Sequence, residues 1–111
     1  MSEKIDPLKI ARSSRDLDAK WLLQFFCSHT FRFGSWGPHN FVDIKNRGFR
    51  FNVQGHHHTG HVYLFVNGLD LFDIYLTSSH GTIKETINDV YLDDLFDTLD
   101  KKIEWIDIYE D

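Results

Sequence analysis

Residues 61–77 read HVYLFVNGLDLFDIYLT, and this stretch decides the fold. Both of its ends are rich in β-branched, aromatic and large aliphatic side chains, which favour β-strands. Between them stands Asn67-Gly68, a dipeptide typical of two-residue hairpin turns because both residues tolerate positive φ. The stretch therefore predicts an antiparallel hairpin, with strands over His61–Val66 and Leu69–Thr77.

Further strands are expected on both sides of this hairpin. Upstream, Phe49, Phe51 and Val53 alternate with polar residues, which is the two-residue period of a half-buried strand. A shorter strand is expected over Phe41–Lys45, and Thr82–Thr86 is expected to form an edge strand. The sequence thus predicts an antiparallel meander of four to five strands.

Two amphipathic helices are expected to frame the meander. The first covers about residues 15–28, and residues 33–39 are expected to form a loop because they contain Gly and Pro. The second helix is marked by apolar residues at helical spacing: Leu92, Phe96, Leu99, Ile103 and Ile106. Strands and helices do not alternate, so the predicted class is α+β, with an N-terminal helix, the meander, and a C-terminal amphipathic helix packed on the sheet.

Composition limits the classes of protein to which this chain can belong. Of its 111 residues, 41% are hydrophobic and 15% aromatic, which is typical of a folded domain and not of a disordered segment. We expect a flexible N-terminal arm over residues 1–12 and a single α+β domain over residues 13–111. Cys27 is the only cysteine, so no intramolecular disulfide forms, and we expect it to be buried. Because the sequence shows no apolar leader and no membrane span, the expected compartment is the cytoplasm.

Acidic residues are concentrated in the predicted C-terminal helix. Residues 89–111 contain nine acidic residues and two lysines, whereas residues 1–88 contain eight acidic and ten basic residues. Five of the acids recur at helical spacing, one position after the apolar residues: Asp93, Asp97, Asp100, Glu104 and Asp107. Successive residues lie about 100° apart around a helix, so we expect one exposed acidic stripe beside the buried face.

This acidic stripe supports two interpretations. It can be a hydrated face that keeps an aromatic-rich domain in solution. Alternatively, it can be complementary to a basic surface, because carboxylates one helical turn apart lie about 5–6 Å from each other, a spacing comparable to that of nucleic-acid phosphates. The second interpretation predicts a non-enzymatic protein-binding module, which mimics nucleic acid and occupies the basic nucleic-acid-binding surface of a protein partner. The negative net charge disfavours direct nucleic-acid binding by the chain itself, and no membrane contact is expected.

Histidines form a second cluster, between two predicted strands. His56, His58 and His61 are weaker candidates for metal ligands, because His-x-His in an extended chain places two imidazoles on one side, as zinc accepts. The spacing matches no standard zinc motif, so a polar turn and a pH-responsive surface remain open as alternatives. We therefore expect no cofactor, with zinc as the alternative. The alternative function is a metal-binding protein or a metal-dependent enzyme.

A third interpretation is a structural or assembly subunit. The two strands of the central hairpin carry apolar side chains on both faces, and an exposed apolar face is commonly an interface. Unless a helix covers that face, a homodimer is expected through Tyr63, Phe65, Leu71 and Tyr75. The sequence leaves open whether the aromatic residues 31–41 are buried or form a contact surface.

Three runs of sequence resemble small uncharacterised proteins of bacterial mobile elements and phages: Gly48–Gly55, Val62–Asn67 and Val90–Leu95. The similarity covers about residues 40–105 and contains no catalytic motif. The resemblance implies a gene carried for manipulation of a host, a group in which compact acidic inhibitors such as anti-CRISPR proteins are frequent. It thus implies an inhibitor of a host defence protein, in agreement with the acidic stripe.

Overall fold

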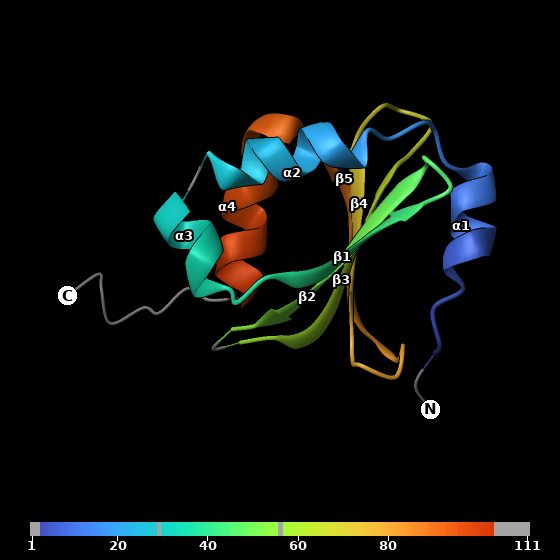
Figure 1. The fold of residues 1–111 in the computed structure, drawn as a ribbon. Coiled ribbons are helices and arrows are strands. Elements are labelled where there is room, and N and C mark those ends of the chain that lie inside the picture. The colour runs from blue at the N-terminus through green and yellow to red at the C-terminus, as the bar shows by residue number, and fades with distance from the viewer. Residues whose placement is uncertain (1–2, 29, 56, 104–111) are drawn as a thin grey trace.

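The computed structural model describes residues 3–28, 30–55 and 57–103 and has the predicted α+β class (Figure 1). One antiparallel sheet of five strands follows chain order, β1-β2-β3-β4-β5, which confirms the predicted meander. The elements are α1 (Pro7–Ser13), α2 (Ala19–Cys27), α3 (Thr30–Ser35), β1 (His39–Ile44), β2 (Gly48–Gln54), β3 (Thr59–Val66), β4 (Phe72–Thr77), β5 (Ile83–Val90) and α4 (Leu92–Ile103). Among the described residues, no helix is both long enough and apolar enough to cross a membrane.

The sheet separates two layers of helices. In Figure 1, α2, α3 and α4 lie on one side of the sheet and α1 lies on the other. Both faces of the central strands are apolar: along β3, Val62 and Leu64 join the core under α2–α4, whereas Tyr63 and Phe65 join a smaller cluster under α1. Alternate residues of a strand point to opposite faces, so β3 supplies both layers.

Aromatic rings form the centre of the larger core. Trp36, which follows α3, stacks on Phe96 of α4 with 4.8 Å between ring centroids. Its edge contacts Phe33 at 5.3 Å, and it lies parallel to Phe51 of β2 at 6.4 Å. Such ring pairs contribute about 0.5–1.5 kcal/mol each beyond the burial of their area. These contacts therefore hold α3, α4 and β2 together.

The N-terminal segment is not a loose arm along its whole length. Residues 7–13 form α1, which follows the N-cap Asp6, whose carboxylate accepts a hydrogen bond from the Lys9 N–H. Ala11 of this helix is buried against the sheet. The prediction of a flexible arm is thus wrong for α1, because seven residues are too few to show a helical period in the sequence.

The central hairpin is confirmed, but its turn is longer than the predicted two residues. β3 ends at Val66 and β4 begins at Phe72. Asn67 organises the loop between them, since its side-chain oxygen accepts hydrogen bonds from the N–H groups of Leu69 (2.8 Å) and Leu71 (3.3 Å). An Asn side chain that bonds the backbone following it favours such a loop over a tight turn.

Other details also differ from the predictions. Residues 33–35, expected in a loop, belong to α3, and β5 continues to Val90 instead of ending at Thr86. Cys27, expected to be buried, is exposed at the end of α2. The predicted extension of the C-terminal helix to Ile106 lies outside the described residues.

Candidate functional site

The predicted acidic stripe does not form one exposed row in the described part of α4. Asp93 and Asp97 are exposed, but Asp100 is buried, with 5% of its surface accessible. Asp100 accepts hydrogen bonds from Trp36 Nε1 at 2.9 Å and from Arg32 Nη2 at 3.0 Å, and the same Nη2 reaches Asp97 Oδ1 at 2.9 Å. The prediction of an exposed stripe is therefore wrong at Asp100. Two further residues of the stripe lie outside the described part of the chain: Glu104 and Asp107.

The position of α3 against α4 explains this result. A row of side chains about 100° from the apolar row lies at the edge of the buried face, where a neighbouring helix can cover it. Arg32 of α3 reaches this edge and also lies over the Phe96 ring, 5.0 Å from its centroid. Burial lowers the pKa of Arg32, but the hydrogen bonds with Asp100 and Asp97 outweigh burial and raise this pKa above its ordinary value. Both carboxylates are therefore engaged by Arg32, Asp100 inside the fold and Asp97 at the surface.

The two described members of the predicted metal site, His58 and His61, do not converge on one point. His58 is buried, with its Nε2 lying 3.1 Å from the backbone oxygen of His61, whereas the His61 ring lies beside Tyr63 on the sheet. Burial is the main cause that lowers the pKa of both His58 and His61. Within residues 3–28, 30–55 and 57–103, no group of three or more His, Cys, Asp or Glu could hold a metal. His56 lies outside these ranges, so zinc binding stays a prediction.

The sheet face expected for homodimerisation is partly covered by α1. Tyr63 and Phe65 are 5% and 1% accessible and cluster with Ala11 of α1. Tyr75 packs half-buried beside them, whereas Leu71 lies in the hairpin loop. Of the two alternatives that the sequence left open, a helix therefore covers this face at Tyr63 and Phe65, and that helix is α1, which the sequence did not predict. Homodimerisation itself stays a prediction.

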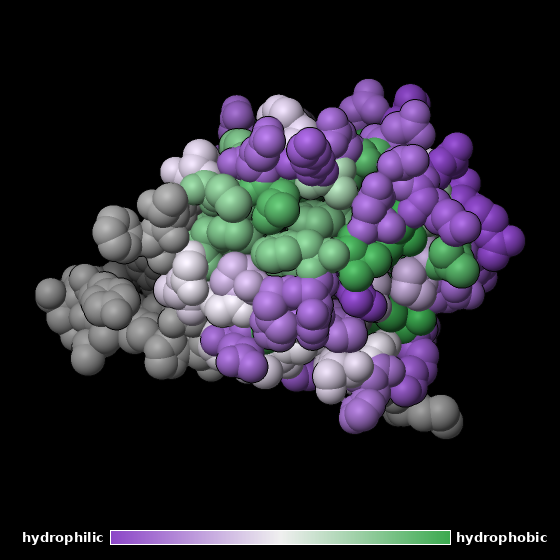
Figure 2. All heavy atoms as spheres, viewed as in Figure 1, coloured by the Kyte–Doolittle hydropathy of each residue, from purple (hydrophilic) through white to green (hydrophobic). Residues whose placement is uncertain are grey.

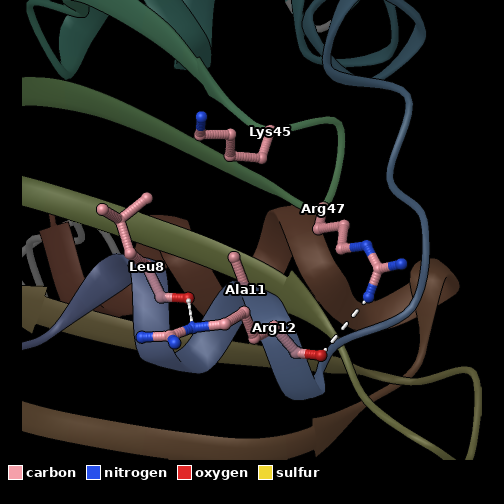
Figure 3. A pocket seen from close by; sticks show the side chains of 5 residues that line it. All are labelled: Leu8, Ala11, Arg12, Lys45 and Arg47. Carbon is pink, nitrogen blue, oxygen red and sulfur yellow. Dashed lines mark hydrogen bonds between the residues drawn. The ribbon is translucent and has the colours of Figure 1, made fainter.

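A pocket of about 430 Å³ lies between α1 and the turn that joins β1 to β2 (Figure 3). Leu8, Ala11 and Arg12 line it from α1. Lys45 and Arg47 line it from the turn. The pocket therefore combines aliphatic and cationic side chains, with no acidic residue in its lining.

A second pocket, of about 280 Å³, shares Leu8 and Lys45 with the first. Its lining comes from α1, the first three strands and the turn between β1 and β2: Pro7, Leu8, Val42, Asp43, Ile44, Lys45, Arg50 and Tyr63. We call the two pockets together the α1 groove. The lining of the α1 groove is mainly apolar and cationic, with Asp43 as its acidic member.

Most cations of the α1 groove are not neutralised within the described structure. Arg47 is engaged, because its Nη1 donates to the backbone oxygen of Arg12 at 3.3 Å and its Nε lies 3.8 Å from Asp16. Arg12, Lys45 and Arg50 form no ion pair with any residue that the structure describes. The α1 groove therefore keeps positive charge that an acidic ligand can meet.

Exposed apolar side chains occur in α1 and in the edge strand β1, where Val42 lies on the side of the α1 groove and Phe41 packs on the larger core. Leu8, Phe41 and Val42 are 53%, 40% and 37% accessible, although each is large and apolar. Figure 2 shows apolar side chains gathered in the middle of this face of the molecule, between hydrophilic residues on either side. Phe33 and Trp36 are buried, so the aromatic segment left open by the sequence is divided between core and surface. Exposed apolar side chains that lie together, as Leu8 and Val42 do, are typical of an interaction surface.

Sequence reasoning missed the α1 groove, although two signals for it were present. Asp6-Pro7 is a typical beginning of a helix, and basic residues outnumber acidic residues in the first 88 positions. Neither signal shows that Arg12 and Lys45 meet across a groove, since they lie far apart in the sequence. Comparison of the chain with protein-family models, with curated proteins and with solved structures finds no match.

Proposed function

We propose that this chain is a non-enzymatic protein-binding module whose α1 groove holds an acidic, partly apolar segment of a partner protein. The observation that carries the proposal is the lining of the first pocket. There Arg12, Lys45 and Arg47 surround Leu8 and Ala11, without an acidic residue. Aliphatic and cationic side chains suit recognition of a ligand that carries both apolar and acidic groups.

The two parts of the lining would contribute in different ways. Burial of the apolar area contributes about 25 cal/mol per Å² and supplies affinity. Cations on the rim attract an acidic segment over a longer range and speed its association, an effect that falls with salt. We therefore expect binding that weakens with salt but is not abolished by it.

A protein segment fits the α1 groove better than a nucleic acid does. The formal net charge of the chain is −5, which repels a long polyanion approaching from solution. The exposed Leu8 and Val42 also require an apolar group on the ligand, which a phosphate backbone lacks. The proposal thus keeps the protein-binding function predicted from sequence but changes the partner's contact surface from basic to acidic.

The test is a titration of the ¹⁵N-labelled full chain with two synthetic peptides, one with Glu alternating with Leu and one with Lys replacing each Glu. We expect the acidic peptide to shift the amide resonances of Leu8, Arg12 and Lys45. The double variant Arg12→Glu/Lys45→Glu should weaken this binding by at least about tenfold. Lys20→Glu/Lys84→Glu changes the net charge equally on exposed positions outside the α1 groove, and should have little effect.

Three results would contradict the proposal. The first is equal weakening by both double variants, because binding would then depend on net charge alone. The second is a preference for the basic peptide with shifts at Asp93 and Asp94, which would return the contact to α4. The third is tighter binding of a single-stranded oligonucleotide than of the acidic peptide in the α1 groove.

A further inference from the structure

Three polar side chains lie next to one another on the sheet face that α1 partly covers. Arg50 and Asn52 are alternate residues of β2 and therefore point to the same face. Across the strand pair, His61 is the register partner of Asn52, and Tyr63 is the register partner of Arg50. Of the three, Arg50 lines the second pocket of the α1 groove together with Tyr63, and Asn52 and His61 follow Arg50 and Tyr63 along the same sheet face.

Each of the three side chains has a buried polar atom that finds no hydrogen-bond partner among the described residues. These atoms are Arg50 Nε, Asn52 Oδ1 and His61 Nδ1. Most buried polar atoms in folded proteins are paired, and leaving one unpaired is destabilising. The effect is strongest at Arg50, because this partly buried cation forms no ion pair with any residue that the structure describes.

All three positions can present a hydrogen-bond donor. The Nε of Arg50 always carries a hydrogen. A half-turn of the Asn52 amide exchanges its oxygen and nitrogen, and the proton of a neutral His61 can reside on Nδ1. Three donors grouped on one face match an oxyanion. The planar fork of arginine matches the two oxygens of a carboxylate.

We infer that Arg50, Asn52 and His61 form a carboxylate-binding subsite, which adjoins the α1 groove at Arg50 and takes an Asp or Glu side chain of the partner segment. The source of the carboxylate rests on the proposed function, whereas the subsite is a property of the three residues themselves. A carboxylate here would pair with Arg50 and accept hydrogen bonds from Asn52 and His61. It would thus supply the partners that the buried atoms lack.

The charge state of His61 offers a specific readout of this subsite. Burial lowers the pKa of His61, and the charges of Arg50, His58 and His39 lower it further. At neutral pH the ring is therefore uncharged and donates one hydrogen bond. A bound carboxylate adds a negative charge beside the ring, so it should raise the pKa of His61 and bind more tightly as the pH falls.

The experiment is an NMR titration of the isotope-labelled full chain with sodium acetate, with sodium chloride adjusted to keep ionic strength constant. We expect saturable shifts of the Arg50 Nε–H and Asn52 side-chain amide resonances, and a rise in the pKa of His61. Arg50→Gln should weaken acetate binding by about tenfold or more. Arg15→Gln is the matched control, because Arg15 pairs with Asp70 outside the α1 groove, and it should change acetate binding by less than about twofold.

Each remaining outcome counts for or against the inference. Absence of saturable acetate shifts at Arg50, Asn52 and His61 overturns the subsite, even if acidic peptides bind in the α1 groove. Inorganic phosphate that binds about tenfold more tightly than acetate overturns the carboxylate assignment. If the chain binds acetate at these residues but does not bind acidic peptides, the result supports the subsite and contradicts the proposed function. Failure of the subsite and failure of the proposed function are therefore distinguishable.

Discussion

Asp100 joins α4 to α3 through one buried carboxylate. Its oxygens accept from Trp36 Nε1 and Arg32 Nη2, so Asp100→Ala leaves both donors without this partner. We expect a loss of about 1.5–3 kcal/mol in unfolding free energy, measured by urea denaturation. Asp97→Ala is the matched control, because it removes a carboxylate from the same arginine at a side chain that is 65% exposed. Asp97→Ala should lower the unfolding free energy by less than about 1 kcal/mol. Equal losses for the two variants would show that burial of Asp100 does not strengthen its contribution to stability.

His58 links stability to pH. Burial is the largest cause that lowers its pKa below the ordinary 6.5, partly opposed by its hydrogen bond with the His61 carbonyl. The unfolded chain therefore binds a proton at a higher pH than the folded chain. Stability should be lost as the pH falls below about 6.5, with a slope of at most about 1.4 kcal/mol per pH unit for one proton. His58→Gln should reduce the slope of unfolding free energy against pH, whereas His80→Gln, at an exposed position, should leave that slope unchanged. Urea denaturation at a series of pH values between 7 and 5 measures both variants.

At the scale of elements, the end of β2 docks closely on the end of α4. The N–H of His57 donates to the Ile103 carbonyl at 2.8 Å, and a Cβ atom at Gly55 would overlap that carbonyl. Gly55→Ala should therefore destabilise the fold by about 1–3 kcal/mol, because backbone must shift to make room. Gly34→Ala in α3 is the control: its Cβ would meet nothing within 4 Å, so stability should hold or rise. Thermal melts check both, and an unchanged midpoint for Gly55→Ala would contradict the close docking.

At the scale of the whole molecule, we expect α1 to be the layer that separates most easily from the sheet. It has seven residues, and the two pockets of the α1 groove lie along it. Hydrogen bonds from Arg15 and Arg47 hold the C-terminal end of α1. The Arg15 N–H donates to the Val66 carbonyl at 2.8 Å, and Arg47 Nη1 donates to the Arg12 carbonyl at 3.3 Å. Amide hydrogens of α1 should exchange at least about tenfold faster than those of β3. Arg47→Ala should raise the exchange rate of the α1 amides and leave that of the β3 amides unchanged. Equal protection of α1 and β3 would show that they open together and that the α1 groove cannot widen separately.

Much of the architecture follows from local patterns. The alternation at Phe49, Phe51 and Val53, the apolar runs around Asn67-Gly68 and the period of Leu92, Phe96 and Leu99 are all properties of neighbouring residues. They were sufficient to predict an antiparallel meander of four to five strands, which has five in the structure, and the amphipathic helix α4. The same patterns did not predict the length of the hairpin loop, because the side chain of Asn67 fixes that loop by accepting hydrogen bonds from the backbone.

The sequence by itself determined the class of fold and which residues could enter the core, because periodicity is a local property of the chain. Tertiary structure alone decided which charges remain available. It brought Arg32 to Asp100, 68 positions away, and so removed a carboxylate from the expected stripe. It also placed Arg12 beside Lys45 in one pocket. Coulomb and hydrogen-bond energies depend on distance and burial, and neither quantity is encoded in the spacing of residues along one helix.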